Sequence, residues 1–95
     1  MISVSDLAEK RGNFCEACGR TSRALERHHC FVHRMRSVPE LDDERNLQAV
    51  CRECHATIAN SRDNRMRFWQ VQLVRYPDLR EWYDSLPLKV KERFE

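Results

Sequence analysis

The sequence predicts a small α+β fold in a single domain that spans residues 1–95. A chain of this length can form one modest hydrophobic core and is too short for two. Its first half contains two short apolar stretches of strand length, whereas residues 52–95 contain no glycine and repeat apolar side chains every three or four positions. Four of the five cysteines form two closely spaced pairs. Because 34% of the residues are charged and no apolar run approaches about 20 residues, we expect neither a disordered tail nor a membrane protein.

Local signals place the first elements along the chain. Residues 5–12 predict a short helix that is capped by Ser5 and ended by Gly12. Strands are expected over residues 24–30 and 46–50, because both stretches are short and carry apolar side chains. The segment between them should be a polar loop.

The second half of the chain is expected to be helical. Residues 52–61 should form a helix that continues through residues 62–76, and Pro77 should begin a further one. Each of the last two helices has an apolar face that we expect to pack in the core, formed by Met66, Trp69, Leu73 and Tyr76 in one and by Leu79, Trp82, Tyr83 and Leu86 in the other.

The cysteine spacing predicts a metal site. Residues 1–12 carry charged side chains where a secretion signal would be apolar, so we expect a cytoplasmic protein whose thiols stay reduced. Disulfides would leave Cys30 unpaired and would close two strained tight loops. Two Cys-x-x-Cys pairs suit tetrahedral zinc, so we predict a structural Zn²⁺ bound by Cys15, Cys18, Cys51 and Cys54. A cross-braced finger that recruits Cys30 and His33 into a second site remains the alternative.

The basic side chains are mostly arginine, with 14 Arg and 3 Lys. The formal net charge of +2 falls to about zero once four thiolates and one Zn²⁺ are included, so bulk charge does not argue for nucleic acid. Arginine's planar fork nevertheless suits bidentate contact with phosphate, which makes the composition a mild indication of a phosphate-bearing partner.

Three histidines and an asparagine, His28, His29, Asn46 and His55, accompany the cysteine pairs. They occur in the segments Cys15-Glu-Ala-Cys18, Leu25-Glu-Arg-His28-His29, Asn46-Leu47 and Val50-Cys51-Arg-Glu-Cys54-His55. In identity, order and spacing, residues 14–60 resemble the zinc-stapled HNH endonucleases, also called ββα-metal or His-Me finger nucleases, of the small freestanding form known from phages and bacteria. Residues 61–95 would form a helical extension.

The resemblance implies a fold, an activity and a set of residue roles. The fold would be a ββα-metal core stapled by the four cysteines, with a short N-terminal helix and a C-terminal helical extension. The activity would be metal-dependent hydrolysis of DNA phosphodiester bonds, in which a cation offsets the charge that develops on the phosphate. His29 would be the general base, since imidazole titrates near neutral pH. His28 and His55 would hold Mg²⁺ or another divalent ion such as Mn²⁺ or Ni²⁺, and Asn46 would position the loop that presents the base.

Backbone geometry adds two expectations. Successive helical residues lie about 100° apart, so Cys54 can face the zinc while His55 faces a second ion. Adjacent residues of a strand point to opposite faces, so His28 and His29 can flank one phosphate only where the strand becomes irregular. We therefore expect irregular backbone at or just after His29.

The expected partner is DNA. Arg34 and Arg36 follow the predicted base and Arg52 precedes His55, so these arginines are the candidate phosphate contacts and would make binding salt-dependent. No membrane partner is expected, and a homodimer or a larger protein partner remains open. The alternative function is a non-catalytic zinc-binding module that binds nucleic acid or a protein partner, in which replacing His29 would change no activity.

Overall fold

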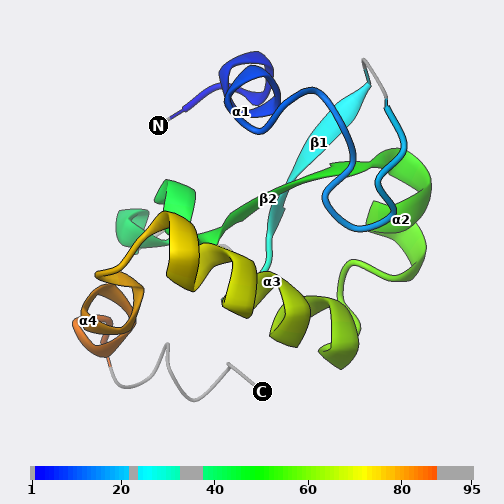
Figure 1. Cartoon of the computed structure of the whole chain (residues 1–95). Helices are drawn as coiled ribbons and strands as arrows, with labels where there is room; N and C mark the ends of the chain where they lie inside the picture. The colour runs from blue at the N-terminus through cyan, green and yellow to red at the C-terminus, as the bar shows by residue number, and fades with distance from the viewer. Residues whose placement is uncertain (1, 22–23, 33–37, 88–95) are drawn as a thin grey trace.

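Four α-helices and a two-stranded sheet form the described part of the chain, which covers residues 2–21, 24–32 and 38–87 of a computed structural model (Figure 1). No helix in these ranges is long and apolar enough to cross a membrane. The predicted α+β class is confirmed. In chain order the elements are α1 (Val4–Lys10), β1 (Leu25–His29), the 3-10 turns η1 (Pro39–Asp42) and η2 (Glu44–Asn46), β2 (Leu47–Cys51), α2 (Arg52–Thr57), α3 (Arg62–Arg75) and α4 (Leu79–Asp84).

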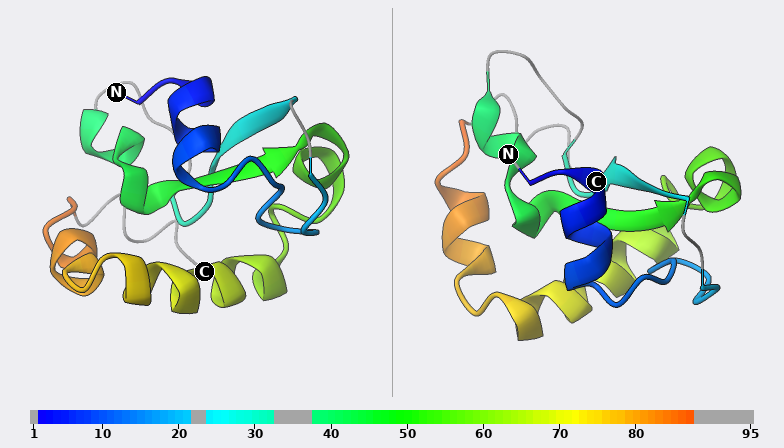
Figure 2. Two further views of the ribbon diagram at one scale, coloured as in Figure 1. Left: turned by 45° about the horizontal axis from the view of Figure 1, so that its top comes forward. Right: turned by 90° about the horizontal axis from the view of Figure 1, so that it is seen from above.

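The sheet is an antiparallel pair of β1 and β2 that lies between α1 and α3 (Figures 1 and 2). Its register places Leu25 opposite Cys51. Consecutive strand residues point to opposite faces. Ala49 accordingly joins the apolar cluster around α1, whereas the side chain of Gln48 bonds to Asn64 of α3. The two faces of one short strand therefore contact different helices.

Two apolar clusters make up the core. The first lies between α1, the sheet and the cysteines, and consists of Leu7, Cys15, Leu25, Leu47, Ala49, Val50, Cys51 and Cys54. The second joins the segment after β1 to α3 and α4, and consists of Cys30, Phe31, Val32, Val38, Leu41, Phe68, Leu79, Trp82 and Leu86. The C-terminal helices thus complete the core instead of standing apart from the motif-bearing segment.

The expectation of a polar loop between the strands is wrong. Phe31, Val32, Val38 and Leu41 are all buried in the second cluster. Buried loop backbone needs hydrogen-bond partners, and here the side chain of Asn46 supplies several of them. The segment can therefore enter the core although its described part forms only short 3-10 turns and irregular backbone.

The buried face of α3 differs from the predicted one. Met66 is 56% exposed, and the fully buried positions are Asn64, Phe68 and Gln72, spaced four residues apart. The two amides are satisfied, since Gln72 donates to main-chain carbonyls of η2 and Asn64 pairs with Gln48. Partly buried apolar side chains of α3, namely Trp69, Leu73 and Tyr76, pack beside this face as predicted.

The helix boundaries follow local capping. Ser3, rather than Ser5, caps α1 by accepting a hydrogen bond from the Asp6 amide at 3.1 Å. Gly12 follows the helix with φ +91°, a left-handed conformation that ends α1 as predicted. The helix after β2 is shorter than expected, because α2 ends at Thr57.

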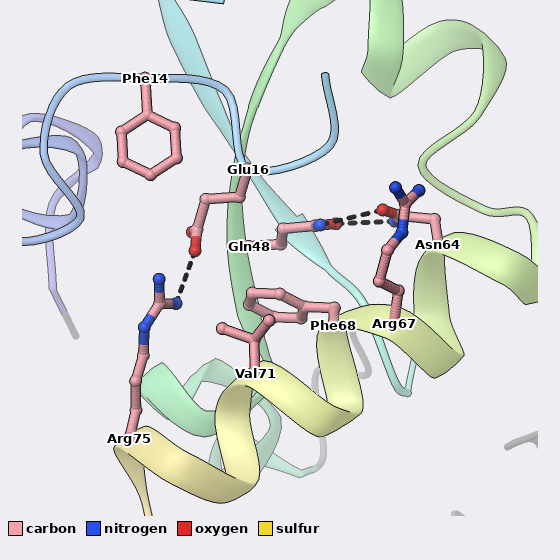
Figure 3. A pocket seen from close by; sticks show the side chains of 8 residues that line it. All are labelled: Phe14, Glu16, Gln48, Asn64, Arg67, Phe68, Val71 and Arg75. Carbon is pink, nitrogen blue, oxygen red and sulfur yellow. Dashed lines mark hydrogen bonds and ion pairs between the residues drawn. The ribbon is translucent and has the colours of Figure 1, made fainter. Parts of the chain in front are cut away.

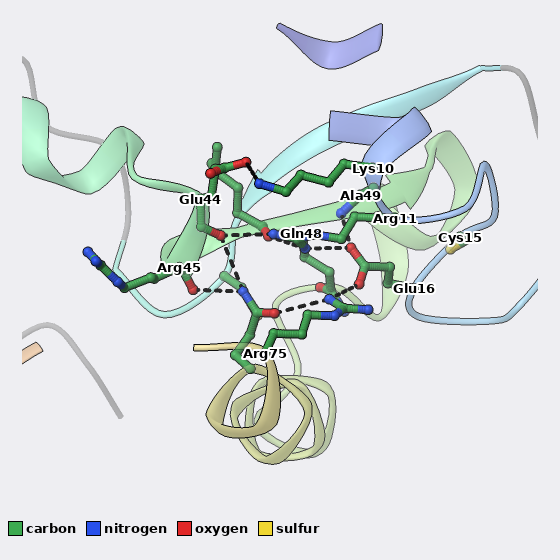
Figure 4. A network of polar contacts seen from close by, with 12 residues as sticks. Lys10, Arg11, Cys15, Glu16, Glu44, Arg45, Gln48, Ala49 and Arg75 are labelled. Atoms are coloured by element: carbon green, nitrogen blue, oxygen red, sulfur yellow. Dashed lines mark hydrogen bonds and ion pairs between the residues drawn. The ribbon is translucent and has the colours of Figure 1, made fainter. Parts of the chain in front are cut away.

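A buried arginine fixes the loop that carries the first cysteine pair (Figure 4). Arg11 follows α1, and its Nη1 donates to Glu16 Oε1 and to the Leu47 carbonyl, both at 2.9 Å. Glu16 Oε1 also accepts from the Ala49 amide at 2.9 Å, and Oε2 accepts from Arg75 of α3. A buried ion pair is tolerated only when its remaining hydrogen-bonding groups are satisfied in this way. The network holds the first cysteine loop against β2.

Candidate metal centre and histidine cluster

Four cysteines from three places in the fold form one cluster. Cys15 and Cys18 belong to the loop after α1, Cys51 ends β2, and Cys54 lies in the first turn of α2. Their sulfur atoms all lie within 4.8 Å of one another, and no described cysteine forms a disulfide. Thiolates bound tetrahedrally to zinc at 2.3 Å lie about 3.8 Å apart. The cluster can therefore hold a metal ion such as zinc, as the spacing predicts.

The first cysteine loop has the local geometry of a metal-binding turn. The Ala17 and Cys18 amides each lie 3.4 Å from Cys15 Sγ, and Gly19, at φ +82°, donates its amide to the Cys15 carbonyl at 2.8 Å. Burial raises the pKa of Cys15, but backbone amides of Cys51, Cys18 and Ala17 outweigh it and lower the pKa to about 7. These amides favour the thiolate, which is the form that binds metal.

The fifth cysteine is not part of this cluster. Cys30 is buried in the second apolar cluster, where burial raises its pKa to about 12. It therefore behaves as a small apolar side chain. Its suggested partner in a cross-braced finger, His33, lies outside the described residues.

His28 of β1 and His55 of α2 lie together on one face of the sheet. Their ring centroids are 5.2 Å apart at an interplanar angle of 64°. Two imidazoles bound to one ion at about 2.1 Å with a tetrahedral angle would place their centroids about 5 Å apart. The separation is thus compatible with a shared ion. Among the described residues, however, only the cysteine cluster brings three or more ligand atoms of His, Cys, Asp or Glu together.

Hydrogen bonds define the tautomer of each of these two rings. His28 Nε2 lies 2.9 Å from the Ala59 carbonyl oxygen, which can only accept, so Nε2 carries the proton and the neutral ring has its lone pair on Nδ1. His55 Nδ1 lies 2.7 Å from Glu26 Oε1, so in this ring Nδ1 carries the proton and Nε2 the lone pair. A carboxylate on the second ring nitrogen is the usual support of a metal-binding histidine.

His29 has a different environment from its neighbour. Its Nε2 lies 2.7 Å from Oδ1 of Asp42, the last residue of η1, and both side chains are partly exposed. β1 ends at His29, as predicted. Because adjacent strand residues point to opposite faces, the structure brings His28 to His55 and His29 to Asp42, and does not bring the three rings to one point.

Asn46 is fully buried, and both the oxygen and the nitrogen of its side-chain amide form hydrogen bonds. Its Oδ1 accepts from the Phe31 and Val32 amides at 2.9 and 3.0 Å, and its Nδ2 donates to the Val32 and Leu41 carbonyls at 2.9 and 2.8 Å. These bonds tie the segment that follows His29 to the turn that carries the paired carboxylate. The positioning role that the resemblance implies for Asn46 is compatible with them.

The predicted DNA contacts are only partly described. Arg52 lies beside His55, Glu26 and Ala56 around an open depression of about 310 Å³. This places a cation next to the exposed edge of the His55 ring. Arg34 and Arg36 lie outside the described residues.

The sequence interpretation missed four polar residues that support the histidines. Glu26 precedes His28 by two positions, and the period of a strand could have placed both on one face. Asp42 lies in an acidic stretch with no distinguishing local signal. A reciprocal amide pair further supports His28 through its acceptor: Asn64 Nδ2 lies 2.8 Å from the Ala59 oxygen and 2.8 Å from Gln48 Oε1.

A separate groove of about 250 Å³ lies between the first cysteine loop and α3 (Figure 3). Its apolar walls come from Phe14, Phe68 and Val71, with Arg67 and Arg75 beside them. None of the motif histidines lines the groove, but Gln48 and Asn64, which support His28 through the Ala59 carbonyl, do.

Comparison of the chain with family models, curated proteins and solved structures gives no significant match. The assignment of a function therefore depends on the geometry of the cysteine cluster and the histidines described above.

Proposed function

We propose that this protein is a metal-dependent endonuclease of the HNH type that hydrolyses DNA phosphodiester bonds and contains a structural zinc ion. One observation carries the proposal. All three motif histidines are hydrogen-bonded through one ring nitrogen to an acceptor, which assigns the proton to that nitrogen: His28 to the Ala59 carbonyl, His29 to Asp42 and His55 to Glu26. Rings oriented in this way suit ligation and proton transfer better than freely rotating surface histidines do.

The two faces of β1 suggest different roles for the histidines that they carry. His28 and His55 would hold a divalent ion, which would supply charge stabilisation to the phosphate. His29 would take the proton of the attacking water at Nδ1, while the new phosphorus–oxygen bond forms and the bond to the leaving 3′ oxygen breaks. Arg52 would contact a neighbouring phosphate. Because His28 and His29 point to opposite faces of β1, the scissile phosphate would have to lie at the end of the strand, where it could be reached from both faces.

The cysteine cluster supports the same proposal structurally. Zinc held by Cys51 and Cys54 would fix the junction of β2 and α2, and the residue after Cys54 is His55. Structural zinc sites of this kind contribute folding free energy directly. The ion would thereby set the position of the exposed candidate ligand.

A second candidate function is a non-catalytic zinc module that binds nucleic acid or protein. It is favoured by the burial of His28, which is 3% exposed and bonded to main chain, as a purely structural histidine would be. The two functions differ in one respect that can be measured. Only the endonuclease loses an activity when His29 is replaced.

The deciding experiment incubates supercoiled plasmid with wild type, His29→Ala or Glu9→Gln, each in EDTA, Mg²⁺, Mn²⁺ or Ni²⁺. Glu9 is an exposed residue of α1 and serves as the control. We expect metal-dependent nicking or linearisation by wild type and Glu9→Gln, and cutting about 10²- to 10⁴-fold slower by His29→Ala at equal zinc content and thermal stability. If zinc-loaded wild type cuts in none of the metals, the endonuclease proposal is wrong and the zinc module takes its place.

A further inference from the structure

We propose that Asp42 is a positioning residue for the general base: its carboxylate holds the His29 ring with Nε2 protonated, so that Nδ1 receives the proton of the attacking water. This inference rests on the proposed function, since it assigns a partner to the base of that reaction. Its starting point is the 2.7 Å contact between Asp42 Oδ1 and His29 Nε2. Asp42 is not part of the motif on which the site was predicted.

The contact is built by the fold and is not a chance meeting of two surface side chains. Asp42 is the last residue of η1, and Leu41 before it is fully buried in the second apolar cluster. The Leu41 carbonyl accepts from Asn46 Nδ2 at 2.8 Å. The Asp43 amide after it donates to the Glu40 carbonyl at 3.2 Å. The backbone on both sides of Asp42 is therefore anchored.

The same asparagine anchors the other partner. Asn46 Oδ1 accepts from the Phe31 and Val32 amides, two and three residues after His29. The Cys30 amide, directly after His29, donates to the Asn46 carbonyl at 2.8 Å. One buried residue thus fixes the backbone next to the base and the backbone next to its carboxylate. Asn46 therefore does more than hold a loop in place, because it sets the distance between the side chains of His29 and Asp42.

The chemistry of the pair follows from its donors and acceptors. An ionised carboxylate only accepts, so His29 Nε2 must donate and Nδ1 carries the lone pair. When water attacks the phosphorus, a new P–O bond forms while the water O–H bond breaks, an N–H bond forms at Nδ1 and the ring becomes an imidazolium. The bond to the 3′ oxygen breaks with its electron pair on that oxygen, which then takes a proton from solvent. The Asp42 carboxylate stays ionised and stabilises this cation, as orienting carboxylates of catalytic histidines do. Asp42 itself contacts neither water nor phosphate.

The expected effect is a loss of turnover with little change in substrate binding. Removing a whole general base costs about 10²- to 10⁴-fold, and a group that only orients the base should cost less. We expect Asp42→Ala to lower kcat by about 10- to 100-fold with an unchanged KM. Asp42→Asn can still accept from Nε2 but lacks the charge, and Asp42→Glu restores the charge on a longer side chain, so both should fall between wild type and Asp42→Ala.

The test measures kcat and KM on plasmid or a short duplex for wild type, the three Asp42 variants, Glu40→Gln and the double variant His29→Ala/Asp42→Ala. Glu40 is an exposed residue of the same turn, and its substitution should leave both constants unchanged. Nitrogen-15 NMR of the histidine rings supplies a signature that general loss of stability would not produce. We expect a protonated Nε2 on His29 in wild type and a mixture of tautomers in Asp42→Ala.

The outcomes separate this inference from the function on which it rests. If wild type cuts and Asp42→Ala cuts with the same kcat, Asp42 has no positioning role although the endonuclease stands. A further loss on adding Asp42→Ala to His29→Ala would also overturn it, because Asp42 would then act other than through His29. If wild type does not cut at all, both proposals fail. Should Asp42→Ala fail to fold, the isosteric Asp42→Asn variant decides by its kcat.

Discussion

Cys54 and His55 are consecutive residues of α2, but their side chains belong to different clusters. Cys54 joins the other three cysteines, whereas His55 faces His28 and bonds to Glu26. The 100° rotation per residue of an α-helix produces this separation without any further device. The first turn of one short helix therefore connects the cysteine cluster to the histidine cluster.

This connection predicts that the histidine cluster depends on zinc. A chelator, or Cys54→Ser, should remove one zinc ion per chain and with it free energy of unfolding on the order of 10 kcal/mol. We expect loss of cooperative thermal unfolding, measured by circular dichroism beside elemental analysis. Cys30→Ala is the control and should retain its zinc. A chain that loses zinc but keeps the wild-type melting temperature would contradict the prediction.

Asn46 should be the most sensitive polar residue of the fold. Asn46→Ala removes four hydrogen bonds and leaves buried backbone groups of Phe31, Val32 and Leu41 without this partner. Each unsatisfied buried group costs about 1 to 3 kcal/mol, so we expect a loss of about 3 kcal/mol or more in urea unfolding. Asn60→Ala, at an exposed position, should change stability by less than about 0.5 kcal/mol. Equal effects of the two substitutions would show that the buried amide is not needed.

Glu26 should tune metal binding through His55. Glu26→Gln keeps the size of the side chain but weakens its support of the ring proton on His55 Nδ1. Loss of such a partner typically lowers metal affinity by about 10- to 100-fold. Titration of the zinc-loaded protein with Mn²⁺ measures this effect, with Glu9→Gln as the control. Unchanged affinity in Glu26→Gln would argue that His55 does not bind the ion.

Cys30 should make the protein less stable in alkali. Burial raises its pKa to about 12 in the folded chain, from an ordinary value of 9.0. Above pH 9 the unfolded chain loses this proton and the folded chain keeps it, so unfolding becomes easier as pH rises from 9 toward 12. In this range the free energy of unfolding should fall by about 1.4 kcal/mol for each pH unit. Urea unfolding of the zinc-bound protein between pH 8 and 10.5 should show this slope in wild type and not in Cys30→Ala. If the unfolding free energies of wild type and Cys30→Ala change in parallel with pH, this prediction is wrong.

The cysteine cluster could be predicted from the sequence. The spacing within each Cys-x-x-Cys pair lets both sulfur atoms reach one ion, and the cluster forms as the spacing indicates. The proximity of His28 and His55, whose ring centroids lie 5.2 Å apart, was expected only from the resemblance. Local rules also predicted irregular backbone at or just after His29, where β1 ends, and Gly12 as the stop of α1.

The rest depends on tertiary partners that no local pattern reveals. The buried positions of α3 include Asn64 and Gln72, which a hydrophobic pattern assigns to solvent. Their burial is favourable only because Gln48 and the carbonyls of η2 lie opposite them. Likewise, the contact of Asp42 with His29 is made by a turn that Asn46 holds in place.

The segment that carries the motif is shorter than the segment that contributes side chains to the two apolar clusters of the core. Residues 14–60 contain every motif position, but Leu7 and Arg11 precede them and Phe68 and Gln72 follow them, all buried. A recombinant fragment trimmed to residues 14–60 would expose both apolar clusters and lose the arginine that anchors the first cysteine loop. Transplanting this site into another protein would therefore require grafting at least residues 7–86, which span both apolar clusters, as one piece.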